Sequence, residues 1–218
     1  MGPLEVLADG RPLELGGHKQ RAMLAVLVLE ANRVVSSDHL IDALWEDQPT
    51  PTAAKALQVY VSQLRKALGR DRVVTAPGGY LLRAEPDEVD LARFQQLHRD
   101  GRPHEALALW RGEPLAEFGQ RRFAQADIAE FEELHLACVE ARIEADLAEG
   151  RNVVGELEAL VAAQPLREHL RRLLLLALYR ADRQADALAA YRKTSMCRRH
   201  ASPVSPIRGS CSATSCRA

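Results

Sequence analysis

The segment from residue 50 to residue 69 restricts the possible fold more than any other part of the sequence. Its apolar residues recur every three or four positions: Leu57, Val61, Leu64 and Leu68. This spacing is typical of an α-helix with one buried face. Thr50-Pro51 is a favourable helix start, and Gly69 can end the helix with a positive φ. The segment therefore predicts a helix whose other face is free to meet solvent or a partner.

The patterns around this helix predict a winged helix-turn-helix domain. Two helices are expected before it, at about residues 18–31 and 38–45, with a brief extended segment at Val34-Val35 between them. After it, two short extended runs flank the turn Ala76-Pro77-Gly78-Gly79, a pattern that predicts a β-hairpin. Helix, helix, helix and hairpin is the order of elements in a winged helix-turn-helix.

Local patterns add further detail to this domain. A short N-terminal hairpin is expected around Asp9-Gly10, between residues 4–7 and 13–15. Ser36 or Ser37 is expected to cap the second helix. The first helix is expected to bury a single stripe, which consists of Met23, Leu24, Leu27 and Val28.

The chain becomes acidic and almost wholly helical after Glu85-Pro86-Asp87. We expect a winged helix at residues 1–85, a helical domain at 86–193 and a tail at 194–218, so that the fold class is mainly α with a small β component. A similar two-residue motif recurs in the helical part: Gly101-Arg102, Gly150-Arg151 and Asp182-Arg183. Small and apolar residues follow each copy of the motif, as is typical of stacked helix pairs of the tetratricopeptide type.

The helical pattern stops near Tyr191. From Ser195 on, the chain is rich in Ser, Arg, Cys and Pro and has no acidic residue, which predicts a disordered or non-native tail. Its three cysteines lack the close pairing of a zinc site, and Cys138, within a helical pattern, is interpreted as a buried apolar residue. No metal and no cofactor are therefore expected.

Charge separates the two halves of the chain. The formal charges of residues 1–86 cancel, whereas residues 87–191 carry a net charge of about −7. Around the third helix, the single acid Asp71 is outnumbered by basic residues: Lys55, Arg65, Lys66, Arg70, Arg72 and Arg83. Such a patch indicates where a polyanion docks. No apolar run is long enough for a membrane span, and no secretory signal is recognisable, so a cytoplasmic protein is expected.

The face of the third helix opposite its apolar stripe suits the major groove of double-stranded DNA. It holds Lys55, Val59, Ser62, Gln63 and Lys66, with Arg65 on the flank. Lysines neutralise phosphates, Gln63 can pair with an adenine edge, and Val59 can touch a thymine methyl group. The turn at Gly78 and Gly79 can approach a phosphate or the minor groove. The alternative is a solvated helix face; Trp45 can either bind a phosphate or belong to the core.

No catalytic constellation is recognisable, so the sequence predicts a protein that is not an enzyme. Gly16-Gly17-His18-Lys19 lacks the spacing of a phosphate-binding loop. His135 and His169 are interpreted as helix-surface residues, and the carboxylates near residue 130 as a solvated face. No receiver pattern that would accept a phosphate is present.

Several segments closely resemble the Streptomyces antibiotic regulatory protein family. In the first domain they are residues 17–25, 31–36, 40–45, 56–68 and 77–82. In the helical part they are residues 90–94, 109–115 and 155–191. The resemblance extends over most of the chain, and its motifs are specific.

That family joins an OmpR-type winged helix to a helical bacterial transcriptional activation domain. The resemblance implies an activator of secondary-metabolite gene clusters, which binds direct repeats in promoters, often as a homodimer. It further implies recruitment of RNA polymerase through its sigma factor. The DNA contacts implied lie at Gly78 and Gly79 in the wing and, in the recognition helix, at Lys55, Val59, Ser62, Gln63 and Arg65.

The sequence departs from the family pattern in three places. The N-terminal sheet is short by about a strand, and the first helical repeat is abbreviated, because Gly101-Arg102 follows Phe94 so closely. The final helices expected after Tyr191 are replaced by the basic tail. A reading-frame change near Thr194 is a hypothesis that explains this break; transcriptional activity that required the intact tail would refute it.

Two other functions fit the sequence. In one, the acidic helices form a tetratricopeptide-like protein-interaction module, and the winged helix is only a scaffold. In the other, the chain is a truncated DNA binder that does not activate transcription. Mobility shift with promoter fragments tests the first alternative, and a reporter assay tests the second.

Overall fold

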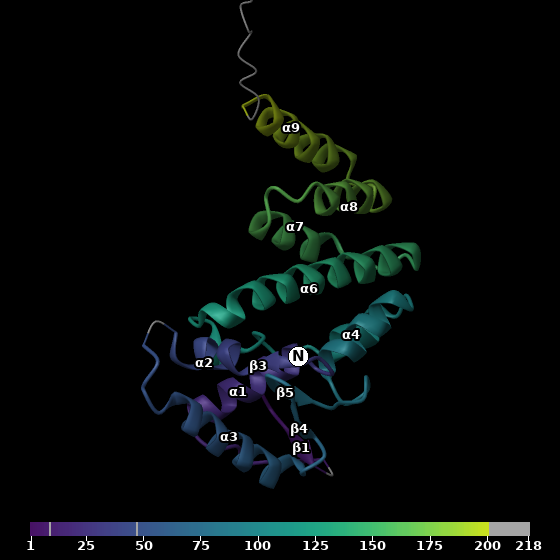
Figure 1. Ribbon diagram of the computed structural model, residues 1–218. Helices are drawn as coiled ribbons and strands as arrows, with labels where there is room; N and C mark the ends of the chain where they lie inside the picture. Colours follow the sequence, from purple (N-terminus) through teal and green to yellow (C-terminus); the bar gives the residue numbers. More distant parts are fainter. Residues whose placement is uncertain (9, 47, 201–218) are drawn as a thin grey trace, which may run out of the picture. The chain divides into compact units, whose positions relative to one another are not determined.

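The computed structural model describes residues 1–8, 10–46 and 48–200, with the backbone alone for 193–200 (Figure 1). Asp9 of the expected N-terminal turn and residues 201–218 of the expected tail lie outside the described residues. The chain divides into two compact units, Met1–Arg142 and Ile143–Ala218.

The first unit contains the winged helix-turn-helix that the sequence predicts. Its elements are α1 (His18–Leu29), β3 (Val35–Ser36), α2 (Ser37–Trp45), α3 (Ala53–Leu68), β4 (Val73–Ala76) and β5 (Gly79–Leu82). The three strands form an antiparallel sheet in the order β3-β5-β4, with Tyr80 opposite both Val35 and Thr75. Ser36 caps α2 as expected, since its hydroxyl accepts a hydrogen bond from the His39 amide at 3.1 Å.

The N-terminal hairpin forms where it is expected but is smaller. Strands β1 (Leu7–Ala8) and β2 (Arg11–Pro12) pair directly beside the turn. Of residues 4–7 and 13–15, where the alternation predicts strands, only Leu7 lies in one. The first residues of the chain instead run along the helical part of the same unit. The amides of Arg111 and Leu115 donate to the carbonyls of Met1 and Gly2 at 2.6 and 3.0 Å.

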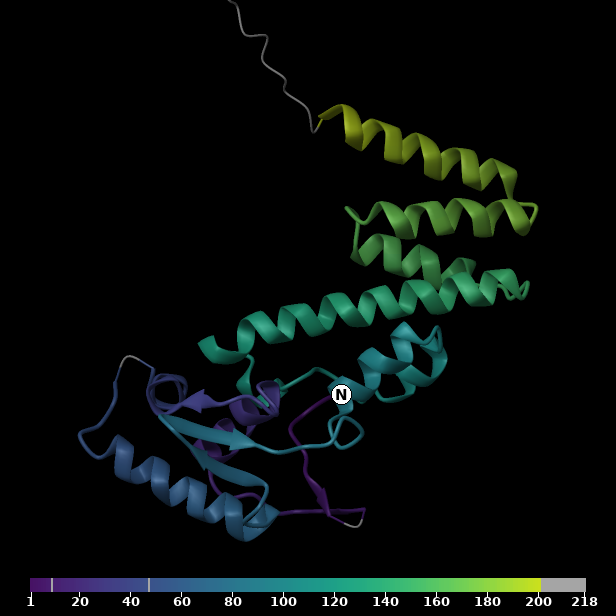
Figure 2. The ribbon, with the colours of Figure 1, turned by 45° about the vertical axis from the view of Figure 1, so that its right-hand side comes forward.

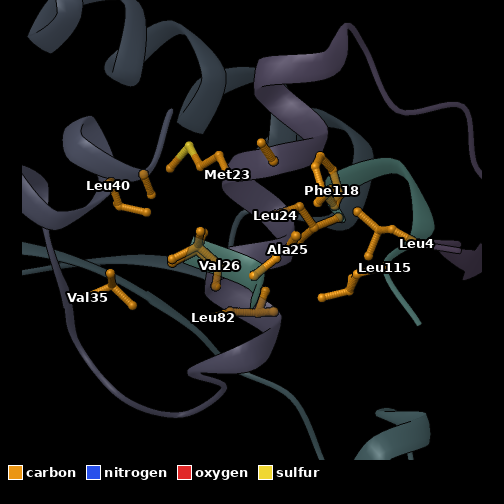
Figure 3. Packing of buried hydrophobic residues seen from close by; sticks show 14 of the residues in the cluster. Leu4, Met23, Leu24, Ala25, Val26, Val35, Leu40, Leu82, Leu115 and Phe118 are labelled. Carbon is orange, nitrogen blue, oxygen red and sulfur yellow. The ribbon is translucent and has the colours of Figure 1, made fainter. Parts of the chain in front are cut away.

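The central part of helix α1, residues 22–27, is buried on all sides, not along one stripe. Residues 22–27 are each at most 3% exposed, whereas Val28, expected in the stripe, is only half-buried. Figure 3 shows the reason. On one side of α1 lie winged-helix residues such as Leu40, and on the other side lie Leu4, Leu115 and Phe118.

The second of these sides explains why the first unit extends beyond the domain boundary expected at residue 85. It also includes α4 (Asp90–Arg99), α5 (Pro103–Ala108), η1 (Ala116–Phe118) and most of α6 (Arg122–Ala148). Phe94 and Phe118 are fully buried in the same apolar cluster as α1. The beginning of the helical region therefore completes the core of the winged helix.

An ion pair reinforces this packing. Arg21 of α1 donates to both carboxylate oxygens of Glu117, at 2.7 and 2.5 Å, and to the carbonyl oxygen of Leu4 at 2.7 Å. The hydrogen bonds to Glu117 raise the pKa of Arg21 above its ordinary value. One guanidinium thus joins three segments that are distant in the sequence.

The second unit stacks α7 (Val154–Ala163), α8 (Glu168–Arg180) and α9 (Gln184–His200), with α8 against both neighbours (Figure 2). Leu157 of α7 and Leu170 of α8 are fully buried. Helix α9 continues to His200, so the prediction of an irregular chain from Ser195 is wrong for residues 195–200. Arg and Met have a good intrinsic helix propensity, and the loss of an apolar period does not by itself end a helix.

The recurring two-residue motif (Gly-Arg or Asp-Arg) lies at three equivalent turns. Gly101, Gly150 and Asp182 all have a positive φ, of 69°, 76° and 57°. In each turn the amide of the following arginine donates at 2.9 Å to a carbonyl five residues back, that of Leu97, Asp146 or Leu178. This is the hydrogen bond of a Schellman helix end, which satisfies a carbonyl that the helix leaves unpaired. The internal repeat seen in the sequence is therefore structural.

Cys138 is fully buried, as predicted, and burial raises the pKa of its thiol to about 11. Within the described ranges, none of the helices combines the length and the apolar character needed to span a bilayer.

Asp182 is the only one of the three turn residues that carries a side chain in the left-handed region, which costs about 1 kcal/mol. We therefore expect Asp182→Gly to raise the free energy of unfolding by about 0.5 kcal/mol, after the entropy of glycine is subtracted. Ala181→Gly is the matched control: Ala181 has a φ of −87°, so the change should lower stability. Urea unfolding of both variants checks this, and equal effects would contradict it.

Candidate nucleic-acid interface

Helix α3 buries the face that its sequence predicts. Leu57, Val61 and Leu64 are 2%, 3% and 0% exposed, and Leu68 is half-buried. The residues expected on the opposite face are all exposed: Lys55, Val59, Ser62, Gln63 and Lys66. Val59 is 52% exposed and is the apolar side chain on a face that is otherwise polar. A face with two cations, an amide, a hydroxyl and one apolar group has the chemistry required to read base edges in a major groove.

The start of α3 differs from the prediction. The helix begins at Ala53, and no side chain among the described residues caps it. Backbone bonds form the entry instead: the amides of Ala53 and Ala56 donate to the carbonyls of Thr50 and Thr52, each at 2.9 Å. Pro51 therefore lies in a turn before the helix. A helix start without a side-chain cap favours an anion, because the positive end of the helix dipole lies there.

Arg65 joins α3 to the hairpin. Its Nε donates to the carbonyl oxygen of Val73 at 2.7 Å, and its Nη2 donates to Oγ1 of Thr75 at 2.7 Å. The sequence predicts a DNA contact from Arg65, on the flank of the recognition face. The structure places two of its donors within the protein, where they set the position of β4 relative to α3.

The two glycines of the hairpin occupy different surroundings. Gly78 is exposed, with a φ of +81° and open space where a Cβ would lie. Its carbonyl accepts a hydrogen bond from the Ser37 amide at 2.9 Å, a link between hairpin and α2 that the sequence did not suggest. Gly79 is buried, and a Cβ on it would clash with the carbonyl oxygen of Val35. Close packing of β5 on β3 therefore requires Gly79, whereas Gly78 remains accessible.

Trp45 packs between α1 and α3. Its ring stacks on that of Tyr60 with centroids 6.3 Å apart, and Nζ of Lys19 lies 4.3 Å from the ring centroid. Of the two interpretations that the sequence left open, the contacts favour the core.

The basic patch contains fewer free cations than its sequence suggests. Arg72 pairs with both carboxylate oxygens of Glu88, and these hydrogen bonds hold the pKa of Glu88 below its ordinary value. By contrast, Lys55, Lys66 and Arg70 are exposed, and none has an ion pair with any residue that the structure describes. Charge counting cannot separate these cases, because Glu88 lies in the next segment of the chain.

Two family models match the chain in the order of its domains. Residues 10–82 match the family described as "Transcriptional regulatory protein, C terminal", and residues 89–200 match the "Bacterial transcriptional activator domain". The regulatory protein DnrI of Streptomyces peucetius is 34% identical over 220 residues, which cover 88% of this chain and 81% of DnrI. The chain belongs to the Streptomyces antibiotic regulatory protein family.

Longer members of this family are also similar. The regulatory protein AfsR of Streptomyces coelicolor is 41% identical over 89% of this chain, which spans only 21% of AfsR. A solved structure of Mycobacterium tuberculosis EmbR, in complex with a low-affinity phosphopeptide, matches with a TM-score of 0.82 and 38% identity. That match covers 90% of this chain and 57% of EmbR. The family resemblance expected from the sequence and the fold class are thereby confirmed.

Among the residues that the structure describes, no three His, Cys, Asp or Glu side chains lie close enough together to hold a metal ion.

Arg65→Met should loosen the hairpin. We expect a loss of about 1–2 kcal/mol in the free energy of unfolding, because two hydrogen bonds from a charged donor are removed. Lys66→Met is the matched control, since Lys66 is exposed, and should change stability by less than about 0.5 kcal/mol. Chemical denaturation of both variants measures the difference, and equal losses would refute the role given to Arg65.

Gly79→Ala should destabilise the sheet by about 1–3 kcal/mol, because the new methyl group meets the backbone of β3. Gly17→Ala is the control, since Gly17 has a φ of −63° and nothing lies within 4 Å of the position that a Cβ would take there. Thermal unfolding compares the two. A Gly79→Ala protein as stable as the Gly17→Ala protein would contradict the packing described.

Proposed function

We propose that this chain is a sequence-specific, double-stranded DNA-binding regulator that activates transcription of secondary-metabolite gene clusters. The observation that carries the proposal is the exposed face of α3, opposite the buried Leu57, Val61 and Leu64. Membership of a family of transcriptional regulators supports it. Because promoter DNA is the partner, the protein acts in the cytoplasm.

In this proposal each residue of the interface has a distinct role. Lys55 and Lys66 neutralise phosphates, while Gln63 pairs with a base edge and Val59 contacts a thymine methyl group. The Ser62 hydroxyl can donate a hydrogen bond to a phosphate, or donate to or accept from a base edge. Gly78 brings the hairpin backbone close to the neighbouring groove or phosphate. Arg65 and Gly79 contribute by holding the hairpin in place.

Activation is assigned to the helical region. We propose that it contacts the sigma factor of RNA polymerase and that two copies bind side by side on direct repeats. The match of residues 89–200 to a bacterial transcriptional activator domain supports this assignment. No catalytic step is part of the proposal, because DNA binding and polymerase recruitment need only contacts.

One observation favours a second function, a protein-interaction module. The second unit exposes several large apolar side chains on α8 and α9: Leu176, Tyr179, Leu188 and Tyr191. A large exposed apolar surface often marks a protein contact. This function and DNA binding are compatible, so the discriminating question is whether the chain binds a promoter specifically.

Mobility shift with promoter fragments that contain direct repeats, over a range of salt concentrations, tests the proposal. We expect Lys55→Ala to weaken binding to all sequences and to reduce the slope of log K against log salt by about 1. Gln63→Ala should cost about 1–3 kcal/mol on the repeat and far less on unrelated DNA. Arg99→Ala, which removes a charge from α4, is the control for net charge.

A chain that shifts no repeat-containing fragment, or Lys55→Ala and Gln63→Ala variants that bind as the wild type does, would rule out this interface. The interaction module would then be the better account.

A further inference from the structure

The C-terminal end of α2 is held by the segment between η1 and α6. Nη2 of Arg121 donates to the carbonyl oxygens of Ala43 and Leu44, each at 3.0 Å. Its Nε lies 3.3 Å from Oε1 of Glu46, and the Arg122 amide donates to the same oxygen at 3.3 Å. The start of α6 lies beside α2 in both views (Figures 1 and 2). Arg121 therefore contacts the end of α2 at three points.

The chemistry of these contacts suits a helix end. The last carbonyls of a helix have no partner within the helix, and they carry the negative end of its dipole. A guanidinium satisfies both needs at once, because it combines a positive charge with several donors. The Arg121 and Glu46 side chains are only 26% and 31% exposed, so that water competes little for their hydrogen bonds.

The backbone at this point is unusual. Glu46 has a φ of +52° and a ψ of −124°, a conformation that a residue with a side chain rarely adopts. Its amide still donates to the carbonyl of Asp42 at 2.7 Å. A strained residue persists only where surrounding contacts hold it. The ion pair of Glu46 with Arg121 and the hydrogen bond that its carboxylate accepts from the Arg122 amide are such contacts.

Glu46 is also the first residue after α2, in the connection that leads to the recognition helix α3. Trp45, directly before it, stacks on Tyr60 of α3. Contacts that fix residues 43–46 therefore act on the angle and spacing between the two helices of the helix-turn-helix.

We propose that Arg121 is a positioning residue for DNA recognition. It lies in the activation region, which is residues 89–200 and matches the bacterial transcriptional activator domain. It fixes the end of α2 and the connection to α3, and so orients the exposed face of α3. Through this contact the activation region and the DNA-reading helix are physically coupled. The proposal rests on the proposed function, since it assigns to α3 the reading of promoter DNA.

Loss of Arg121 lets the connection between α2 and α3 adopt more conformations. The apparent dissociation constant for the specific site then rises in inverse proportion to the fraction of molecules with α3 correctly oriented. We expect an effect of about fivefold or more, the range of ordinary coupling between sites. Binding to unrelated DNA depends mainly on charge and should not change beyond the effect of one lost cation.

The test uses the full chain with Arg121→Met, and Arg99→Met as the charge-matched control. Arg99 is exposed, and among the described residues its side chain bonds only to Gln96 of its own helix. Mobility shifts on a repeat-containing fragment and on an unrelated fragment of equal length give two dissociation constants. The specificity ratio is the dissociation constant for the unrelated fragment divided by that for the repeat fragment. We expect this ratio to fall about fivefold in Arg121→Met and to stay at the wild-type value in Arg99→Met.

A second readout does not involve DNA. The chain has two tryptophans, Trp45 and Trp110, so 5-fluorotryptophan labelling gives two ¹⁹F resonances, which Trp45→Phe assigns. In Arg121→Met we expect the Trp45 resonance to shift or broaden while the Trp110 resonance stays. If Arg121→Met does not fold, Arg121→Lys replaces it, because lysine keeps the charge but lacks the planar guanidinium that reaches the two carbonyl oxygens and the Glu46 carboxylate from different nitrogens.

An unchanged specificity ratio, or an unchanged Trp45 resonance, in a folded Arg121 variant overturns the inference. A wild-type chain that does not prefer the repeat fragment refutes the proposed function instead. In that case the Trp45 resonance still decides whether Arg121 orders the connection to α3.

Discussion

The structure of the first unit depends on one constraint: α1 is apolar around its whole circumference from Ala22 to Leu27. Because residues 22–27 are all buried, α1 needs neighbours on every side. The winged helix covers only part of it, and Leu4, Leu115 and Phe118 cover the rest (Figure 3). The winged helix and the first part of the activation region consequently share one core. The ion pair of Arg21 with Glu117 lies at the same junction and adds direction to packing that is otherwise non-directional.

The same constraint determines which face of α3 is free. Leu57, Val61 and Leu64 complete the core around α1, so the opposite side must point outward. The hairpin is then attached by Arg65 to α3 and by the Gly78 carbonyl to α2, while Arg121 holds the end of α2. The hairpin and the end of α2 are thus each tied to another part of the unit. A rigid support of this kind reduces the conformational entropy lost when an interface forms.

The sequence was sufficient for those features that depend on local periodicity. The spacing from Leu57 to Leu68 identified both faces of α3, and Gly101, Gly150 and Asp182 marked equivalent turns. It was insufficient where distant residues meet. Nothing local to Arg65, Arg72 or Arg121 shows that their partners are Val73, Glu88 and the end of α2. The extension of the compact first unit beyond residue 85 is not visible in the sequence for the same reason, since the missing side of α1 is supplied by residues about ninety positions away.

The central claim is that the outward face of α3 enters a DNA groove. Photo-crosslinking from Ser62 tests it most directly, with benzoylphenylalanine placed at that position and, as the reference, at Arg99 of α4. We predict covalent attachment to bases within the promoter repeat from position 62 and none from position 99. A position-62 protein that still shifts the repeat fragment but forms no crosslink to it would contradict the claim.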